Sequence, residues 1–171
     1  MKLVLDQSLT WPSLPTITAI IRPIDIVGGP YSPAPVVAKR ALIDTGASIS
    51  LLRRETFESV LRVSNKISEK IRSAIQIQGV SGSPILAVPF EVLLELQSRD
   101  GSASAVRQTI VYAATGLHYD FLLGNDLLTF TRLHYHGKGS PVHGESATVS
   151  VCLDEKNGWR LIPNLDAHLM A

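Results

Sequence analysis

One aspartate stands in a sequence context that favours catalysis. Asp44 follows a short apolar run, Gly46 lies two residues later, and a second apolar run begins at Ile49. Short apolar runs bounded by turn residues predict buried strands, and the glycine allows a tight turn between them. A carboxylate on a loop that two strands hold is fixed in space, as acid–base chemistry requires. The stretch therefore predicts a catalytic acid at Asp44.

This stretch resembles the active-site loop of the aspartic proteases, in which Asp, Thr or Ser, Gly, and Ala or Ser follow two apolar residues. Asp44, Thr45, Gly46 and Ala47 match that pattern. The nearest other candidate, Asp100-Gly101-Ser102, has a different order and no apolar strand before it. Two-lobed, pepsin-like members carry two such loops on a much longer chain. One copy on 171 residues resembles the retropepsin type, in which two identical protomers each supply one aspartate.

A second stretch, residues 121–128, resembles the segment that closes a retropepsin-like core. Apolar residues are followed by a glycine, a polar pair and two leucines. The resemblance implies that Leu123 ends a strand beside the active-site loop, that Gly124 allows close backbone contact, and that a short helix begins near Asn125. Asp126 is expected to be a cap or a structural residue, not a further catalytic acid.

Between the two motifs the hydrophobic pattern predicts a β-hairpin. Apolar and polar residues alternate from Ile75 and again over 88–97, and the tip between them is rich in small residues. In retropepsin-like proteases a mobile hairpin at this place, the flap, closes over bound peptide. The resemblance assigns the flap and its substrate contacts to Gly79, Val80, Ser81 and Gly82. An ordinary hairpin turn is the alternative.

The remaining pattern predicts mainly β structure with one or two short helices. Strands are expected over 16–26, 36–43, 49–52, 105–113, 129–136, 147–153 and 159–162. A helix is expected over 53–62, where Phe57, Val60 and Leu61 share one face. Because minimal retroviral enzymes lack this helix, the resemblance is closer to cellular and bacterial single-domain members. The expected fold class is all-β, a retropepsin-like acid-protease barrel with one lobe per protomer.

Length and composition narrow the class of protein. The 171 residues, 45% hydrophobic and 18% charged, predict one globular domain over 15–165, with an N-terminal arm over 1–14 and a C-terminal tail over 166–171. A net charge of +1 gives no reason to expect binding to nucleic acid or an anionic membrane. No signal peptide or membrane-spanning run is apparent, and the single Cys152 fits a reducing compartment, so a soluble cytoplasmic protein is expected.

Three histidines raise the question of a metal site. His134 and His136 share one face of an expected strand, and His143 follows in the next loop. Since no fourth ligand has convincing spacing, neither a metal nor another cofactor is expected.

Together these features predict a homodimeric aspartic endopeptidase that acts on polypeptides. Two carboxylates that share one proton can activate water and protonate the leaving nitrogen, which one Asp44 cannot do alone. A two-fold dimer brings both copies of Asp44 to its axis. The resemblance implies that Thr45 ties the two loops together and that Gly46 lets the backbone contact the carboxylates. A catalytically silent dimer that binds peptides or assembles a complex is one alternative, and pairing with a different protomer is another.

Overall fold

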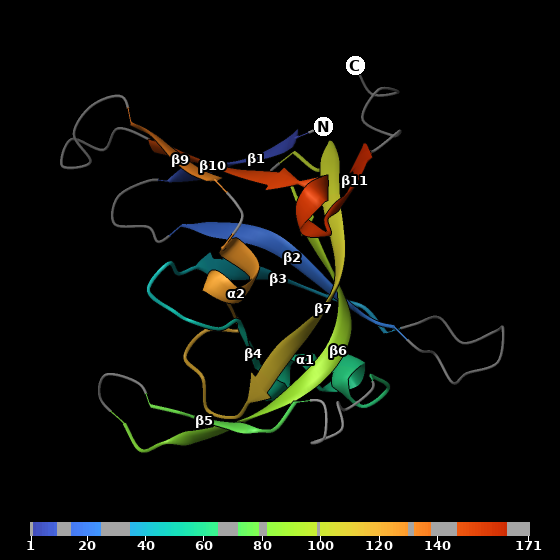
Figure 1. Ribbon diagram of the computed structural model, residues 1–171, viewed down its shortest axis with the longest axis vertical. Coiled ribbons are helices and arrows are strands. Elements are labelled where there is room, and N and C mark those ends of the chain that lie inside the picture. The colour runs from blue at the N-terminus through green and yellow to red at the C-terminus, as the bar shows by residue number, and fades with distance from the viewer. Residues whose placement is uncertain are drawn as a thin grey trace, which may run out of the picture.

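The computed structural model describes the backbone of residues 2–9, 15–24, 35–64, 72–78, 82–98, 100–129, 132–137 and 147–163. In this part of the chain strands predominate (Figure 1). The strands are β1 (Lys2–Leu9), β2 (Thr16–Pro23), β3 (Val37–Ile43), β4 (Leu51–Arg53), β5 (Ile75–Ile77), β6 (Ile85–Gln97), β7 (Ala103–Ala114), β8 (Phe121–Leu123), β9 (Arg132–Gly137), β10 (Ala147–Asp154) and β11 (Arg160–Pro163). The helices are α1 (Arg54–Leu61), α2 (Asn125–Leu128) and the short 3₁₀ helix η2 (Glu155–Asn157). The prediction of a mainly β fold with short helices is confirmed.

Six strands close into a ring, a small barrel. Their order is β7, β4, β8, β3, β2 and β6, and β6 pairs again with β7. β3 runs parallel to β8 and β4 runs parallel to β7, whereas the other pairs in the ring are antiparallel. β5 adds to β6 and β11 adds to β7 outside the ring. Closure leaves the six strands without a free edge, so each is held from both sides.

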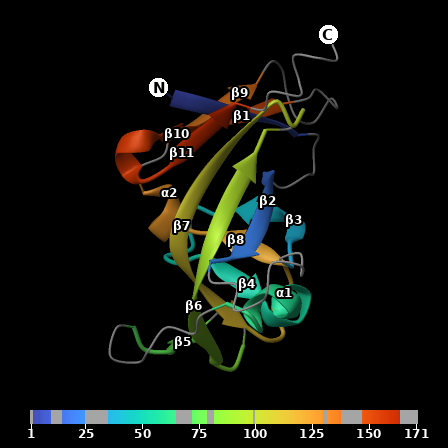
Figure 2. The ribbon, with the colours of Figure 1, turned by 90° about the vertical axis from the view of Figure 1, so that its right-hand side faces the viewer.

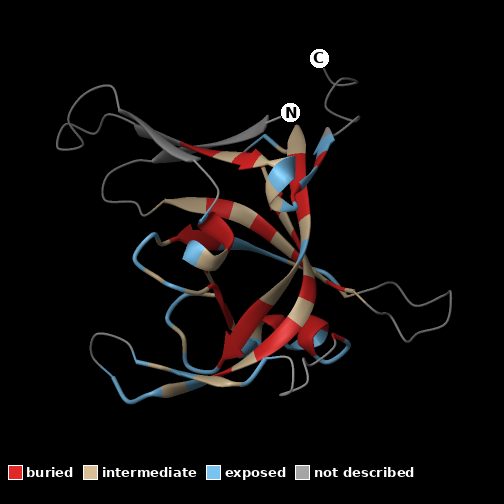
Figure 3. Ribbon diagram, viewed as in Figure 1, coloured by how far each residue is buried: buried red, intermediate tan, exposed pale blue. Residues whose placement is uncertain are grey.

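The barrel strands alternate between buried and partly exposed residues, which gives the banding in Figure 3. Buried side chains in β2 and β6 include Ile17, Ala19, Ile21, Val92, Leu94 and Leu96. Removing one such Ile or Leu side chain fully from water stabilises the fold by about 1.5–3 kcal/mol. The period of two that predicted these strands is thus the pattern of burial that holds the barrel together.

The helix predicted over 53–62 is present as α1 and packs against the barrel by one face. Phe57, Val60 and Leu61 are buried on that face, as their spacing predicts. The Phe57 ring meets Phe121 of β8 edge-on, with ring centroids 6.3 Å apart and ring planes at 78°. This contact fixes α1 beside the strand that precedes Gly124.

A second sheet of three strands, in the order β1, β10, β9, lies at one end of the barrel (Figures 1 and 2). β1 lies within the stretch expected to be an N-terminal arm, and it pairs along its length with β10, from Lys2 opposite Asp154 to Leu9 opposite Ala147. Early and late segments of the chain therefore meet in one sheet. Among the described residues, no helix is long and apolar enough to cross a membrane.

Candidate active site

Asp44 directly follows β3 and is held by its own loop and by the neighbouring strand. Its N–H donates to the carbonyl oxygen of Leu123 at 3.0 Å, which extends the parallel β3–β8 pairing by one residue. Ala47 N–H donates to the Asp44 carbonyl oxygen at 3.2 Å and closes a tight turn. Gly46 N–H donates to Oδ1 of the Asp44 carboxylate at 2.8 Å. The backbone and the carboxylate of Asp44 are therefore both positioned.

The Asp44 carboxylate retains capacity to accept further hydrogen bonds. Within the described part of the chain, Gly46 N–H is its one donor. Asp44 is half-buried, and Thr45 and Gly46 are exposed. A Cβ at position 46 would lie 3.1 Å from Oδ1, which is closer than ordinary van der Waals contact, so space beside the carboxylate favours glycine. No donor among these described residues reaches Oδ2.

Gly124 and Asn125 contact the backbone of the loop that follows Asp44. A Cβ at position 124 would lie 2.4 Å from the carbonyl oxygen of Ile49 and 3.0 Å from that of Ala47, so no side chain fits unless the backbone moves. Asn125 N–H donates to the Ala47 carbonyl oxygen at 2.8 Å, and Asn125 Nδ2 donates to that of Thr45 at 2.7 Å. The structure thus brings together the two motifs that the sequence singles out.

Ser50 connects the same two segments, although no sequence motif singles it out. Its buried hydroxyl accepts a hydrogen bond from Gly124 N–H at 2.9 Å and donates one to Asp126 Oδ1 at 2.6 Å. Asp126 Oδ1 also accepts from Leu127 N–H at 2.9 Å, so its contacts are structural. Ser50 is a lone polar residue in an apolar run. That position indicates a buried hydroxyl in need of partners but does not say which.

An apolar pocket of about 490 Å³ lies between the β5–β6 hairpin and the loop before β8. Its lining residues are Leu51, Ile77, Gly82, Ser83, Ile85, Gly116, Leu117, His118, Tyr119 and Leu122. Leu51 and Leu122 pair across β4 and β8, and Leu122 precedes the residue whose carbonyl holds Asp44. The pocket is therefore connected to the active-site loop through two barrel strands.

Of the four residues expected at the hairpin tip, Gly82 is described and lines this pocket. It is exposed, a Cβ there would meet nothing within 4 Å, and its φ is not left-handed. Gly82 is therefore not required to be glycine by space or by backbone conformation. Gly79, Val80 and Ser81 lie outside the described residues.

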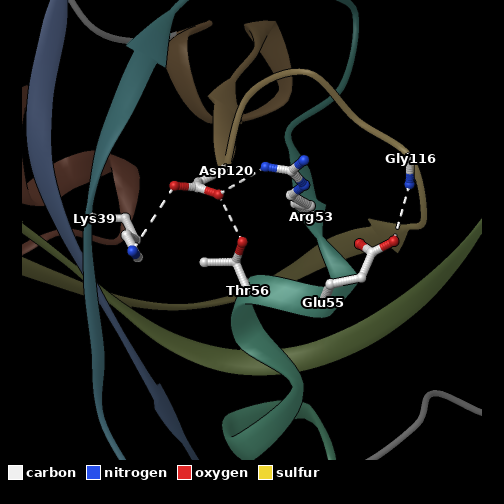
Figure 4. Close-up of polar contacts among 6 residues, drawn as sticks. All are labelled: Lys39, Arg53, Glu55, Thr56, Gly116 and Asp120. Atoms are coloured by element: carbon white, nitrogen blue, oxygen red, sulfur yellow. Dashed lines mark hydrogen bonds and ion pairs between the residues drawn. The ribbon is translucent and has the colours of Figure 1, made fainter.

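Asp120, at the end of the loop before β8, collects contacts from three elements (Figure 4). Its Oδ1 accepts from the Thr56 hydroxyl at 2.6 Å and from Arg53 Nη1 at 3.4 Å. Its Oδ2 lies 3.9 Å from Lys39 Nζ. The hydrogen bond from Thr56 is the main cause that lowers the pKa of Asp120, although burial opposes it. The sequence offers no signal for this cluster, because its members are far apart in the chain.

The start of the same loop contacts the same helix. Gly116 N–H donates to Glu55 Oε1 at 3.1 Å. Hydrogen bonds from the N–H of Glu55 itself and from Gly116 N–H lower the pKa of the Glu55 carboxyl. Both ends of the loop are thus bonded to the first turn of α1.

Asp100, in the Asp-Gly-Ser sequence considered above, lies in the turn between β6 and β7. Asp100 Oδ1 accepts from the Ser102 hydroxyl at 2.6 Å, from Ser102 N–H at 2.9 Å and from the Ser98 hydroxyl at 2.8 Å. These bonds, with the Ser102 hydroxyl first, lower the pKa of Asp100 from 3.8 to about 2. The Asp100 carboxylate therefore stabilises the turn in which it lies.

The described residues contain no group of three or more His, Cys, Asp or Glu placed to hold a metal ion. The side chains of His134 and His136, and the whole of His143, lie outside the described part of the chain.

Comparison with known proteins gives a likeness in fold. No protein-family model matches the chain, and no curated protein matches its sequence. A retropepsin-like aspartic protease from Rickettsia conorii is 11% identical, covers 90% of this chain and 97% of its own, and superposes with a TM-score of 0.42. EIAV protease, solved with the inhibitor HBY-793, is 17% identical over 71% of this chain and 90% of its own, with a TM-score of 0.41.

The structural likeness falls among retropepsin-like aspartic proteases, the family that the sequence resembles.

Proposed function

We propose that this chain is one protomer of a homodimeric aspartic endopeptidase. The observation that supports the proposal most strongly is the state of the Asp44 carboxylate. Contacts from Leu123 and Asn125 hold its loop, yet among the described residues only Gly46 donates to the carboxylate itself. A carboxylate that is fixed in place and not saturated can bind and activate water.

Two copies of Asp44 supply what one lacks. Two carboxylates held close cannot both ionise readily, so the pair retains one proton. The ionised Asp44 takes a proton from water as the water oxygen attacks the peptide carbonyl carbon. The partner's Asp44 gives its proton to the carbonyl oxygen. Collapse of the tetrahedral intermediate then breaks the C–N bond, and the proton taken from water passes from Asp44 to the leaving nitrogen. One hydroxyl of the intermediate returns a proton to the partner's Asp44, which leaves a carboxyl product and restores the singly protonated pair.

The exposed tip of the loop is suited to a two-fold contact. Thr45 and Gly46 are exposed on the protomer, and an isologous interface brings the same residues to the axis from both sides. In the dimer the Thr45 side chains link the two loops, and Ala47 continues the turn. An extended polypeptide lies between the loops and the two flaps, which residues 79–82 form, and uses backbone hydrogen bonds as an added strand does.

The apolar pocket receives a side chain of that polypeptide. Its lining is mostly aliphatic and aromatic, which favours an apolar side chain over a charged one. We place the dimer in the cytoplasm, because the single Cys152 has no partner for an intramolecular disulfide and fits a reducing compartment. No metal or other cofactor takes part in this chemistry.

The proposal is tested by incubating the purified protein with an unstructured polypeptide mixture, with and without an active-site inhibitor of aspartic proteases. New peptide termini that appear only without the inhibitor are expected, and specific activity is expected to fall with the dimer fraction on dilution. A dimer that cleaves nothing would contradict the proposal and favour the silent, peptide-binding alternative. Full turnover by a monomer, established by light scattering at the assay concentration, would contradict the shared pair of aspartates.

A further inference from the structure

One wall of the apolar pocket is a loop that hydrogen bonds attach near both of its ends. Residues 115–120, here called the pocket loop, connect β7 to β8, and Leu117, His118 and Tyr119 line the pocket. Residues 117–119 make no hydrogen bond with any other described residue. Leu117 packs against the apolar cluster that contains Leu51 and Tyr112, and the polar attachments of the loop are at Gly116 and Asp120.

The attachment at Asp120 joins the loop to the beginning of α1. Arg53 N–H donates to the Asp120 carbonyl oxygen at 2.8 Å. The Thr56 hydroxyl donates to Asp120 Oδ1 at 2.6 Å (Figure 4). The Asp120 side chain is 33% exposed, so water screens these contacts only in part. A short hydrogen bond to a partly shielded carboxylate is stronger than a bond between neutral groups.

The attachment at Gly116 uses the neighbouring residue of the same helix. Gly116 has a left-handed φ of 73°, a conformation that residues with a Cβ rarely adopt. In that conformation its N–H donates to Glu55 Oε1 at 3.1 Å. The two ends of the pocket loop are thus held by two consecutive side chains, Glu55 and Thr56.

α1 is a firm support for these contacts because its other face is in the core. Phe57, Val60 and Leu61 are buried, and Phe57 packs edge-on against Phe121, the residue next to Asp120. Close-packed interiors resist displacement, so the first turn of α1 cannot shift without disturbing this packing.

We propose that the first turn of α1 determines the specificity of the apolar pocket. Thr56 and Glu55 hold the pocket loop, and the loop sets the space open to an apolar substrate side chain. This inference rests on the proposed protease function and deepens it. Glu55 and Thr56 are positioning residues, since among the described contacts neither touches the Asp44 loop.

The test uses two peptides that differ in one apolar side chain, Leu or Ala, at the position that the pocket accepts. The ratio of kcat/KM for the two peptides measures the preference. In Thr56→Val this ratio is expected to be about threefold to tenfold smaller than in wild-type protein, because one hydrogen bond is lost. The change should appear in KM, with kcat within about twofold for the preferred peptide, because binding and not chemistry is altered. Thr56→Ser keeps the hydroxyl and should restore the preference.

Glu55→Gln should act in the same direction and less strongly, because Glu55 is exposed. Glu58→Gln is the matched control, since Glu58 lies on the same helix and accepts from Arg62 at 2.7 Å, away from the loop. Amide hydrogen exchange over residues 115–120 should speed up in Thr56→Val and Glu55→Gln but not in Glu58→Gln.

An unchanged peptide preference in Thr56→Val, or an equal change in Glu58→Gln, would overturn the inference. Wild-type protein that cleaves no peptide would count against the proposed protease function. In that event amide hydrogen exchange still tests whether the first turn of α1 holds the pocket loop. Unchanged exchange over residues 115–120 in Thr56→Val would overturn the inference.

Discussion

Two of the turns that the structure describes, at Asp44 and at Asp100, combine an aspartate with a glycine and use the carboxylate in opposite ways. In the β6–β7 turn, Asp100 Oδ1 accepts three hydrogen bonds from Ser98 and Ser102, its neighbours in sequence. In the loop after β3, the Asp44 carboxylate accepts one, from Gly46 N–H, among the described residues. The first carboxylate stabilises its turn, whereas the second keeps acceptor capacity that the proposed reaction would use.

The difference lies in where the support comes from. The Asp100 turn needs only its own serines, as Asx-type turns generally do. The loop of Asp44 is held by Leu123, Gly124 and Asn125, which come from a distant part of the chain. Because distant residues hold the loop, the Asp44 carboxylate does not have to stabilise its own turn. Substitutions in the two turns can therefore be compared as matched pairs.

The largest expected effect is on hydrolysis. Asp44→Asn should lower kcat/KM by about 10⁴-fold or more, because the pair can no longer share a proton in the required way. Asp100→Asn makes the same change in the β6–β7 turn and should leave kcat/KM unchanged. Steady-state kinetics on one peptide, with circular dichroism to verify folding, measures both. Hydrolysis that persists in pure Asp44→Asn protein would refute the assignment.

The next effect is on stability and compares the two glycines. Gly124→Ala should lower the free energy of unfolding by about 3 kcal/mol or more, because its Cβ would lie 2.4 Å from a carbonyl oxygen. Gly101 has a left-handed φ of 71° with nothing within 4 Å of a Cβ, so Gly101→Ala should cost about 1 kcal/mol. Urea denaturation gives both values. Equal losses would show that the Gly124 contact is less close than described.

A smaller effect is expected from the serines. Ser50→Ala should lower the free energy of unfolding by about 1–3 kcal/mol, because Gly124 N–H loses its buried acceptor. Ser102→Ala should cost less, since water can replace its hydroxyl at the open turn. Thermal unfolding of the two variants makes the comparison, and a larger loss in Ser102→Ala would reverse the expected order.

The smallest effect concerns acid stability. The folded state lowers the pKa of Asp100 from 3.8 to about 2, so ionised Asp100 favours the folded state above pH 3.8. That contribution is lost as the pH falls toward about 2. The stability difference between wild type and Asp100→Asn should therefore narrow over this pH range. Urea titrations at several acidic pH values test this, and a constant difference would contradict it.

Much of this architecture could be predicted from the sequence because its signals are local. The period of two marks the barrel strands, and the spacing of Phe57, Val60 and Leu61 marks α1. The loop of Asp44 and residues 121–128 each carry a recognisable motif. A buried strand next to a glycine needs no distant information to be recognised.

The resemblance implies the close contact of Gly124 with the loop of Asp44, but the side-chain contacts of Ser50 and Asp120 could not be predicted. The partners of Ser50 lie 74 and 76 residues away, and Asp120 meets Thr56 across 64 residues. A single sequence contains no signal for such pairs, because each residue type suits many environments. The start of β4 shows the same limit. The sequence predicts a strand from Ile49, whereas β4 begins at Leu51.

The central claim is that one active site needs Asp44 from both protomers, and mixed dimers test it most directly. Wild-type protein and the Asp44→Asn variant are unfolded together in equal amounts and refolded, so that protomers pair at random. If two aspartates are required, only wild-type homodimers are active, and the activity of the mixture should be about a quarter of that of an equal total amount of wild-type protein. An activity of about half would mean that each Asp44 works alone and would contradict the claim.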